Sequence, residues 1–177
     1  MESRASVIRS LAPLGADHYW LEVENLFGSV RPGQFFQVRI DASLFLRRPF
    51  SVARIGAETL GILFKVAGSG TAILARKKPG DPLDMIGPLG NGFPVEDAGP
   101  AVWLAAGGTG VAPLLAAAAR LSADGRAIRF FYGGRTAGHL FPALLPDDDF
   151  PLTLCTDDGS RGRRGTTVEA VVETLVE

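Results

Sequence analysis

The spacing of glycine and proline changes near residue 100, and this change restricts the chain to a small set of folds. Before that point, short segments rich in β-branched and aromatic residues alternate with turns such as RPG, KKPGDP and PLGNGFP. Many short strands separated by such turns are typical of an antiparallel barrel or sandwich. We expect strands at residues 5–13, 18–25, 34–40, 50–55, 59–67 and 82–88.

Beyond residue 100, continuous apolar segments alternate with segments of helical composition. The apolar segments predict buried strands at residues 101–107, 127–134 and 151–156. Helices are expected at residues 111–121, 138–145 and 166–176. Because strands and helices alternate here, we predict a parallel sheet built from βα units, in the manner of a Rossmann-like domain.

The expected fold class is therefore β + α/β, with an antiparallel barrel followed by a parallel-sheet domain. The boundary falls near residues 95–100, in VEDAGP, and separates a domain at 1–97 from a domain at 98–177. Thr166 or Thr167 is placed to cap the last helix, since a hydroxyl there accepts a hydrogen bond from the first helical turn.

Composition and charge exclude several classes of protein. Of the 177 residues, 46% are hydrophobic, which is enough for a sizeable core. The net charge of −1, with both signs mixed along the chain, favours neither nucleic acid nor an anionic membrane as a partner. No run approaches about 18 apolar residues, so no membrane span is expected. The N-terminus lacks the apolar core of a signal peptide, so the expected location is the cytoplasm.

Few residues are suited to metal binding or acid–base catalysis. Cys155 is the only cysteine, which excludes an intramolecular disulfide and a cysteine-built zinc or iron–sulfur site within this chain. Asp157 and Asp158 offer only two neighbouring oxygen donors, so no metal site is expected. The only histidines, His18 and His139, are expected on the surface.

A glycine-rich segment, GGTGVAP, joins the expected strand at 101–107 to the helix that follows it. Gly107, Gly108 and Gly110 allow backbone N–H groups and the helix N-terminus to approach an anion closely. This pattern predicts a pyrophosphate site. The alternative is a tight turn that binds nothing, since the spacing is not G-x-G-x-x-G.

A second glycine turn, VAGSGTAIL, also follows a strand and precedes a short helical run. Gly68, Gly70 and Thr71 of this turn are candidates for binding another phosphate. On its own the pattern is weak, and a turn without a ligand is the alternative.

The segment RRPFS places two arginines before a proline, an aromatic residue and a hydroxyl. An arginine at a strand end can clamp a pyrophosphate with its forked guanidinium. Phe50, two residues after Arg48, lies on the same face of a strand and can pack against a flat ring, while Ser51 can offer a hydrogen bond to its edge. The alternative is a solvated basic edge with Phe50 in the core.

Together these motifs resemble those of the ferredoxin–NADP reductase superfamily, which joins a flavin-binding antiparallel barrel to a nicotinamide-binding α/β domain. The family's flavin signature, Arg-x-aromatic-Ser/Thr, matches RPFS. The resemblance implies that Arg48 holds the FAD pyrophosphate, that Phe50 packs on the isoalloxazine, and that Ser51 reaches toward its N5 atom. The FAD contacts implied in this way are Arg48, Pro49, Phe50, Ser51, Phe64, Lys65, Gly70 and Thr71.

The same resemblance implies a site for NAD(H) in the second domain. The segment GGTGVAP matches the family's nicotinamide segment, and YGGRT matches a later segment that lines the dinucleotide. The implied NAD contacts are Gly107, Gly108, Thr109, Gly110, Arg135 and Asp157.

Charges near the end of the chain bear on the choice of nicotinamide. Asp157 and Asp158 follow the third strand, where a carboxylate accepts ribose hydroxyls and repels a 2′-phosphate, which favours NADH over NADPH. The arginines of SRGRRG are the opposing signal, because they could bind that phosphate. The alternative for these arginines is a solvated basic loop.

The order of six motifs resembles, more narrowly, the electron-transfer subunit of type B dihydroorotate dehydrogenase. The motifs are PGQFFQV, LRRPFSV, KVAGSGT, GPLGNGF, GGTGVAPL and CTDDGS. This resemblance implies a flavoprotein subunit that passes electrons between NAD(H) and a partner through FAD, in pyrimidine biosynthesis. The implied partner is the catalytic dihydroorotate dehydrogenase subunit.

That subunit normally continues with another strand, a Cys-Gly-Pro segment and a cysteine-rich tail that holds a [2Fe–2S] cluster. This sequence ends at Glu177 without those cysteines, so the expected nicotinamide domain is incomplete at its C-terminus. A sheet of about three strands leaves an edge and an apolar face uncovered. We therefore expect self-association or a partner that covers the second domain.

Two other functions remain open at this stage. One is a generic NAD(P)H–flavin or ferredoxin-type reductase, which needs flavin and nicotinamide but no cluster. The other is a non-catalytic interaction module that keeps the fold without redox turnover. Whether this chain turns over on its own is equally open.

Overall fold

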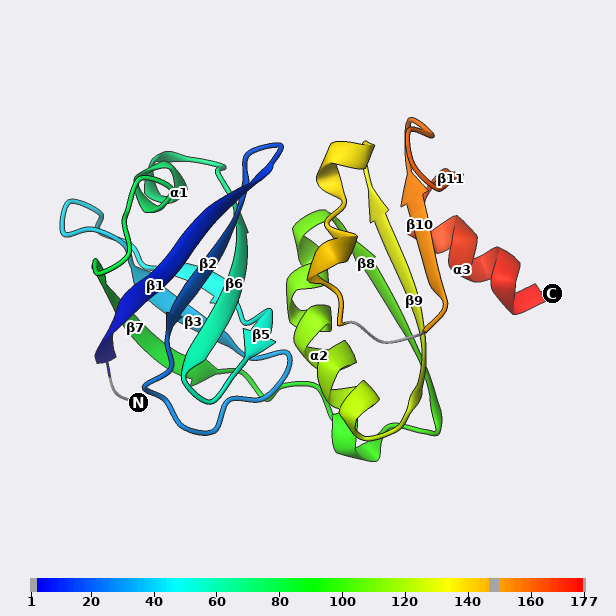
Figure 1. Ribbon diagram of the computed structural model, residues 1–177, viewed down its shortest axis with the longest axis horizontal. Helices are drawn as coiled ribbons and strands as arrows, with labels where there is room; N and C mark the ends of the chain where they lie inside the picture. The colour runs from blue at the N-terminus through cyan, green and yellow to red at the C-terminus, as the bar shows by residue number, and fades with distance from the viewer. Residues whose placement is uncertain (1–2, 147–149, 177) are drawn as a thin grey trace. The chain divides into compact units, whose positions relative to one another are not determined.

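The structure is a computed structural model that describes residues 3–146 and 150–176. The chain divides after Phe93 into two compact units, each with strands of its own (Figure 1). The division lies next to the segment at 95–100 where the sequence changes its pattern of turns.

The first unit is a seven-stranded antiparallel sheet in the order β4-β3-β7-β1-β2-β6-β5. A short helix, α1 (Ser69–Leu74), joins β6 to β7. The strands are β1 (Ser3–Gly15), β2 (His18–Glu24), β3 (Phe35–Arg39), β4 (Arg48–Ser51), β5 (Arg54–Ile55), β6 (Thr59–Lys65) and β7 (Pro82–Leu89).

We predicted one strand at residues 50–55 from the sequence, whereas the structure has two, β4 and β5. β4 pairs with β3, whereas β5 pairs with β6 at the other end of the sheet. The chain passes from one end of the sheet to the other between Val52 and Ala53. The Val52 N–H donates to the Gln34 carbonyl, and the Ala53 N–H donates to the Gly61 carbonyl. Two neighbouring residues therefore join opposite ends of the sheet, which curls it into the expected barrel around a core that includes Phe36, Leu60 and Leu83.

The second unit contains a four-stranded parallel sheet in the order β11-β10-β9-β8. Its strands are β8 (Ala101–Gly107), β9 (Ala127–Gly134), β10 (Leu152–Thr156) and β11 (Arg163–Arg164). Its helices are α2 (Val111–Ala123) and α3 (Thr167–Val176), with 3-10 turns η1 (Val95–Asp97), η2 (Gly108–Gly110), η3 (Ala137–His139) and η4 (Pro142–Leu144).

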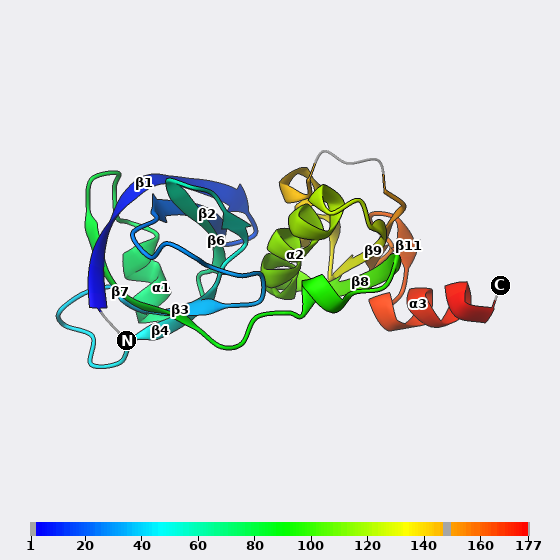
Figure 2. The same ribbon diagram turned by 90° about the horizontal axis from the view of Figure 1, so that it is seen from below.

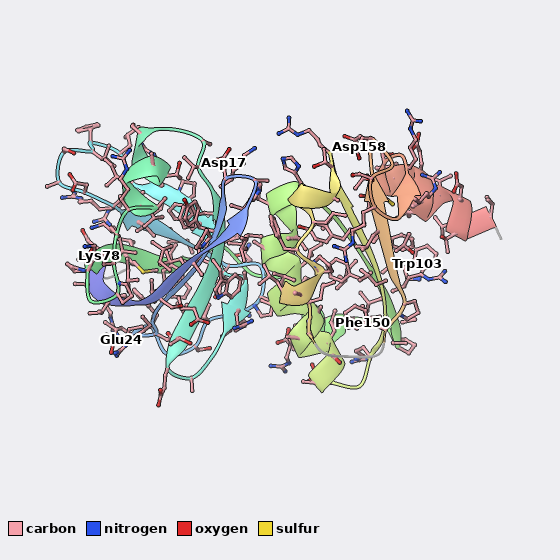
Figure 3. All side chains as sticks on the ribbon, turned by 45° about the horizontal axis from the view of Figure 1, so that its top comes forward. Asp17, Glu24, Lys78, Trp103, Phe150 and Asp158 are labelled. Carbon is pink, nitrogen blue, oxygen red and sulfur yellow. The ribbon has the colours of Figure 1, made fainter. Side chains whose placement is uncertain are left out.

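The two α-helices of this unit lie on opposite faces of the sheet (Figures 1 and 2). Strand residues alternate between the faces. Leu104 and Phe130 are buried on the α2 side. Trp103 lies on the α3 side, where its ring is 5.4 Å from that of Phe131 (Figure 3). The β + α/β fold class predicted from the sequence is confirmed.

Two expectations for the second unit were inaccurate. The segment 138–145 forms two separate 3-10 turns instead of a short helix, because Pro142 lacks the N–H that a continuous helix needs. The sheet has a fourth strand, β11, which is only two residues long and lies in the arginine-rich segment. No run of apolar residues marks it in the sequence.

Helix α3 begins with a reciprocal cap. The Thr166 hydroxyl accepts a hydrogen bond from the Glu169 N–H at 3.2 Å, and the Glu169 carboxylate accepts one from the Thr166 N–H at 2.7 Å. Thr166 is therefore the capping residue. Thr167 instead donates its hydroxyl to the Ala106 carbonyl and so attaches the helix to β8.

Several apolar side chains of the second unit are exposed on the α3 side. Trp103 is 40% exposed. On α3, only Ala170 is buried, while Val168, Val172, Leu175 and Val176 are exposed. None of the helices in the described ranges is long and apolar enough to cross a membrane.

Replacing Thr166 with Ala removes one half of the cap of α3. We expect the free energy of unfolding of the second unit to fall by about 1 kcal/mol, measured by urea denaturation. Val168→Ala, at an exposed position of the same helix, is the control and should change it by less than about 0.5 kcal/mol. Equal effects of both substitutions would show that the cap does not hold the helix.

Candidate functional site

The two arginines of RRPFS have different surroundings. Arg47 donates to the Asp84 carboxylate at 2.5 Å and to the Asp84 carbonyl at 2.7 Å. Its side chain is only 19% exposed. Arg47 therefore fastens the segment before β4 to β7 and is not available to a ligand.

Asp84 is held as an anion by this arrangement. Burial opposes its ionisation, but hydrogen bonds from Arg47 and Ser3, and the charges of Arg47 and Arg39, outweigh that effect. The pKa of the Asp84 carboxyl consequently lies below its usual value.

Arg48 lies across the first turn of α1, which contains Gly70. Its guanidinium donates to the Leu46 carbonyl at 2.7 Å, and a Cβ placed on Gly70 would lie 3.2 Å from the Arg48 Nε. Only a residue without a side chain allows this approach without displacing the arginine. The structure thus brings together a cation and a glycine backbone that are 22 positions apart in the sequence.

The turn beneath Arg48 is fastened by Thr71. The Thr71 hydroxyl accepts hydrogen bonds from the N–H groups of Ala67 and Gly68 at 2.9 and 3.2 Å, and donates to the Gly68 carbonyl. It is therefore committed to the turn. The N–H groups at the start of α1 have no intrahelical acceptor, as in any first turn, and are the donors that this segment presents.

The predicted ring-binding aromatics lie in the barrel. Phe50 of β4 and Phe64 of β6 meet edge to face, with centroids 6.0 Å apart, and Phe64 stacks on Tyr19 at 5.4 Å. Phe50 is 8% exposed and Phe64 is 3% exposed, so both belong mainly to the core. Tyr19, which the sequence did not single out, is half-buried and extends the aromatic row.

The remaining predicted residues of the first unit lie at strand ends. Pro49 is exposed in β4, and Ser51 ends this strand half-buried. Within the described part of the chain, the Ser51 side chain makes no hydrogen bond. Lys65 ends β6 and pairs in register with His18, which is 2% exposed. The expectation that His18 lies on the surface was therefore wrong.

In the second unit, the GGTG segment forms the passage from β8 into α2. Gly107 ends β8, and Gly108, Thr109 and Gly110 form a 3-10 turn whose first residue has φ 53°. A Cβ on Gly107, Gly108 or Gly110 would meet nothing within 4 Å. Neighbouring side chains do not explain these glycines, and the turn presents open backbone at the N-terminus of α2.

The glycines of YGGRT differ in this respect. A Cβ on Gly133 would collide with Thr167, and one on Gly134 would lie 3.1 Å from Leu140. Both positions therefore serve packing around β9. Arg135, directly after them, is exposed.

Three strands carry their candidate residues to one edge of the sheet. Gly107 is in register with Gly133, and Gly134 with Thr156, so GGTG, Arg135 and Asp157 all follow the carboxyl ends of parallel strands. Asp158 marks this edge in Figure 3. In parallel α/β sheets, ligands bind at that edge.

The charged loop after β10 is partly committed to the fold. Ser160 donates to the Asp158 carboxylate through its N–H and its hydroxyl, and these hydrogen bonds hold the pKa of that carboxyl below its usual value. Arg163 is paired with Glu173 and Glu169 of α3. Arg161 and Arg164 are exposed. Among the described residues, Asp157 is thus the exposed acid at this edge whose side chain makes no hydrogen bond or ion pair.

The side chains do not fit an iron–sulfur cluster. Such a cluster takes four thiolates, and Cys155 is the only cysteine of the sequence. It is buried in β10, and burial raises the pKa of its thiol. Among the described residues, no group of three or more histidine, cysteine or acidic side chains is arranged to hold a metal ion.

Comparison with curated proteins gives a consistent result. The dihydroorotate dehydrogenase B (NAD(+)) electron transfer subunit of Bacillus caldolyticus is 38% identical over 151 residues, which cover 80% of this chain and 57% of that protein. The Streptococcus mutans subunit is 36% identical over 156 residues, covering 85% and 60%. This chain is a relative of that electron transfer subunit. It spans about three fifths of the length of the curated relatives it matches.

Solved structures show the same relationship at the level of the fold. The structure of an NADH-dependent reduced ferredoxin-NADP oxidoreductase matches with a TM-score of 0.83 at 30% identity, over 98% of this chain and 64% of that chain. A Neisseria gonorrhoeae ferredoxin NADP+ reductase with bound FAD and NADP matches with 0.81 at 17% identity, over 98% and 77%. The fold is therefore that of the ferredoxin–NADP reductases. No family model matches the sequence.

Replacing Asp84 with Asn removes the anion that holds Arg47. We expect the free energy of unfolding to fall by about 1 kcal/mol at pH 7, as for other partly exposed ion pairs. Because the folded pKa is depressed, this contribution is complete above about pH 5 and is lost as the pH falls through the folded pKa. Urea denaturation of both proteins between pH 3 and pH 7 measures it.

Glu58→Gln serves as the control, because within the described part of the chain this exposed carboxylate makes no hydrogen bond or ion pair. Its effect should stay below about 0.5 kcal/mol at every pH. A difference between wild type and Asp84→Asn that did not change with pH would contradict the assigned role of the ion pair.

Proposed function

We propose that this chain is a flavoprotein electron-transfer component, with FAD bound by the barrel and NADH by the α/β unit. The observation that carries this proposal is the position of Arg48 across the Gly70 turn. A forked cation beside open backbone N–H groups is the arrangement that a pyrophosphate requires.

In this proposal each predicted barrel residue has a separate task. Arg48 binds the pyrophosphate from one side, and the backbone of Gly70 and Thr71 binds it from the other. Thr71 keeps the turn in shape through its hydroxyl. The exposed part of Phe50 contacts the flavin ring, as a minor part of a side chain that otherwise stabilises the core.

The polar groups at the strand ends complete the flavin site. Ser51 has a hydroxyl available for the ring edge, and Lys65 brings a positive charge to the end of β6, beside the aromatic row. The chemistry supplied by bound FAD is acceptance of a hydride from a reduced nicotinamide and onward transfer of single electrons. Hydride transfer needs no acid–base pair from the protein.

The α/β unit binds NADH in the same proposal. The open turn at Gly107–Gly110 and the N-terminus of α2 receive its pyrophosphate, Arg135 lines it, and Asp157 accepts the ribose hydroxyls. The relatives named above are subunits of an NAD(+)-linked dehydrogenase. The proposed partner is accordingly a catalytic dihydroorotate dehydrogenase subunit, and the process is pyrimidine synthesis.

The proposed function is tested by reconstituting the purified chain with FAD and following NADH oxidation with a dye as electron acceptor. We expect dye reduction that depends on added NADH and on the flavin. A chain that binds FAD but does not support reduction by NADH would reduce the proposal to a flavin-binding module.

Arg48→Gln tests the pyrophosphate assignment, because Gln keeps length and polarity but not the charge. Loss of a charge-assisted pair should raise the Kd for FAD by roughly 10- to 100-fold, measured by flavin fluorescence titration. Arg9→Gln, on the exposed side of β1, removes the same charge elsewhere and should leave the Kd unchanged. If the two variants bind FAD equally well, Arg48 does not hold the pyrophosphate.

Asp157→Asn tests the preference for NADH. Removing the carboxylate removes its repulsion of a 2′-phosphate, so the ratio of kcat/KM for NADH to that for NADPH should fall about tenfold. Asp158→Asn is the matched control, since that side chain is engaged with Ser160. An unchanged ratio in Asp157→Asn would assign cofactor choice to other residues, such as Arg161.

A further inference from the structure

Phe45 is the most exposed large apolar side chain among the described residues, with 96% of its surface accessible. It lies in the loop between β3 and β4, followed by Leu46, which is 63% exposed. An aromatic ring held wholly in water gains nothing from the hydrophobic effect, so its position is explained better by a ligand than by folding.

The loop that carries Phe45 is fastened at both ends. Asp41 accepts hydrogen bonds from the N–H and the hydroxyl of Ser43 at 2.9 and 2.6 Å, which forms a closed turn. At the other end, the Leu46 carbonyl accepts the guanidinium of Arg48 at 2.7 Å. These hydrogen bonds fix both ends of the loop that carries Phe45.

The same loop borders the pyrophosphate cradle of Arg48 and Gly70. A Cβ on Gly70 would lie 3.2 Å from Arg48 and 3.5 Å from Leu44, so the loop and the arginine side chain meet over one glycine. Leu44 also packs against the barrel core. Phe45 is the next residue, and its side chain extends into solvent beside this cradle.

The order of groups along the chain matches the order of groups in a dinucleotide. Phe50 and Arg48 lie on the same face of β4, about 7 Å apart along the strand, at the proposed ring and pyrophosphate positions. Phe45 precedes Arg48 by three residues, within about 10 Å. A ligand with its ring at Phe50 and its pyrophosphate at Arg48 places its adenosine on the side of Phe45.

We infer that Phe45 is the platform on which the adenine of FAD stacks, and that it makes the barrel selective for FAD over FMN. The inference rests on the proposed function. An aromatic ring suits this task because every base has a flat face, and stacking needs no hydrogen bonds. Two exposed residues are too few for a protein interface, which needs about 800 Å² from each partner.

The test compares the Kd values for FAD and FMN in the wild type and three variants, by flavin fluorescence titration of the full chain. Phe45→Ala removes the ring, Phe45→Leu keeps the apolar bulk without an aromatic face, and Phe45→Trp keeps the face. We expect Ala and Leu to weaken FAD binding about tenfold, Trp to preserve it, and all three to leave FMN binding unchanged. Because Phe45 is exposed, all variants should keep the wild-type thermal unfolding midpoint.

Arg48→Gln separates the two proposals, because it should weaken FAD and FMN alike. Unchanged FAD binding in Phe45→Ala, in a chain whose wild type binds FAD, would overturn the role of Phe45 and leave the flavin site intact. Equal weakening of FAD and FMN would also overturn it, since the loop would then act on the shared phosphate. A wild-type chain that bound neither flavin would overturn both proposals.

Discussion

The pairing of Arg47 with Asp84 determines what its neighbour can do. Two adjacent arginines would ordinarily repel each other and point to solvent. Here Arg47 is fixed onto β7 by the Asp84 carboxylate and carbonyl, so the start of β4 is held in place. Arg48 then extends over the Gly70 turn, and its own guanidinium organises the loop that carries Phe45. The proposed flavin site therefore depends on a structural ion pair that contacts no ligand.

Glycines in this chain serve two purposes that the sequence does not distinguish. Gly133 and Gly134 make room for Thr167 and Leu140, whereas the glycines of GGTG adjoin open space. Both sets lie at the carboxyl ends of parallel strands, and the resemblance assigned both segments to the dinucleotide. Only the surrounding side chains show that one set is packed against the protein and that the other is accessible to a ligand.

Much of the fold could be predicted from residue patterns, because glycine- and proline-rich turns separate the short strands, continuous apolar segments mark the buried ones, and a threonine marks the start of α3. Two of the failures were non-local. β11 is formed by two charged residues that pair with β10, and His18 is buried at the start of β2, which lies between β1 and β6. The commitment of Thr71 to its own turn was equally invisible before the turn was seen.

The central claim is that the barrel unit binds FAD through Arg48 and the Gly70 turn. The most direct test is the visible spectrum of the purified chain, followed by identification of any flavin released on denaturation. The account predicts flavin absorption bands and release of FAD, with the bands greatly reduced in Arg48→Gln. A chain that carries no flavin and takes up none after incubation with FAD would contradict it.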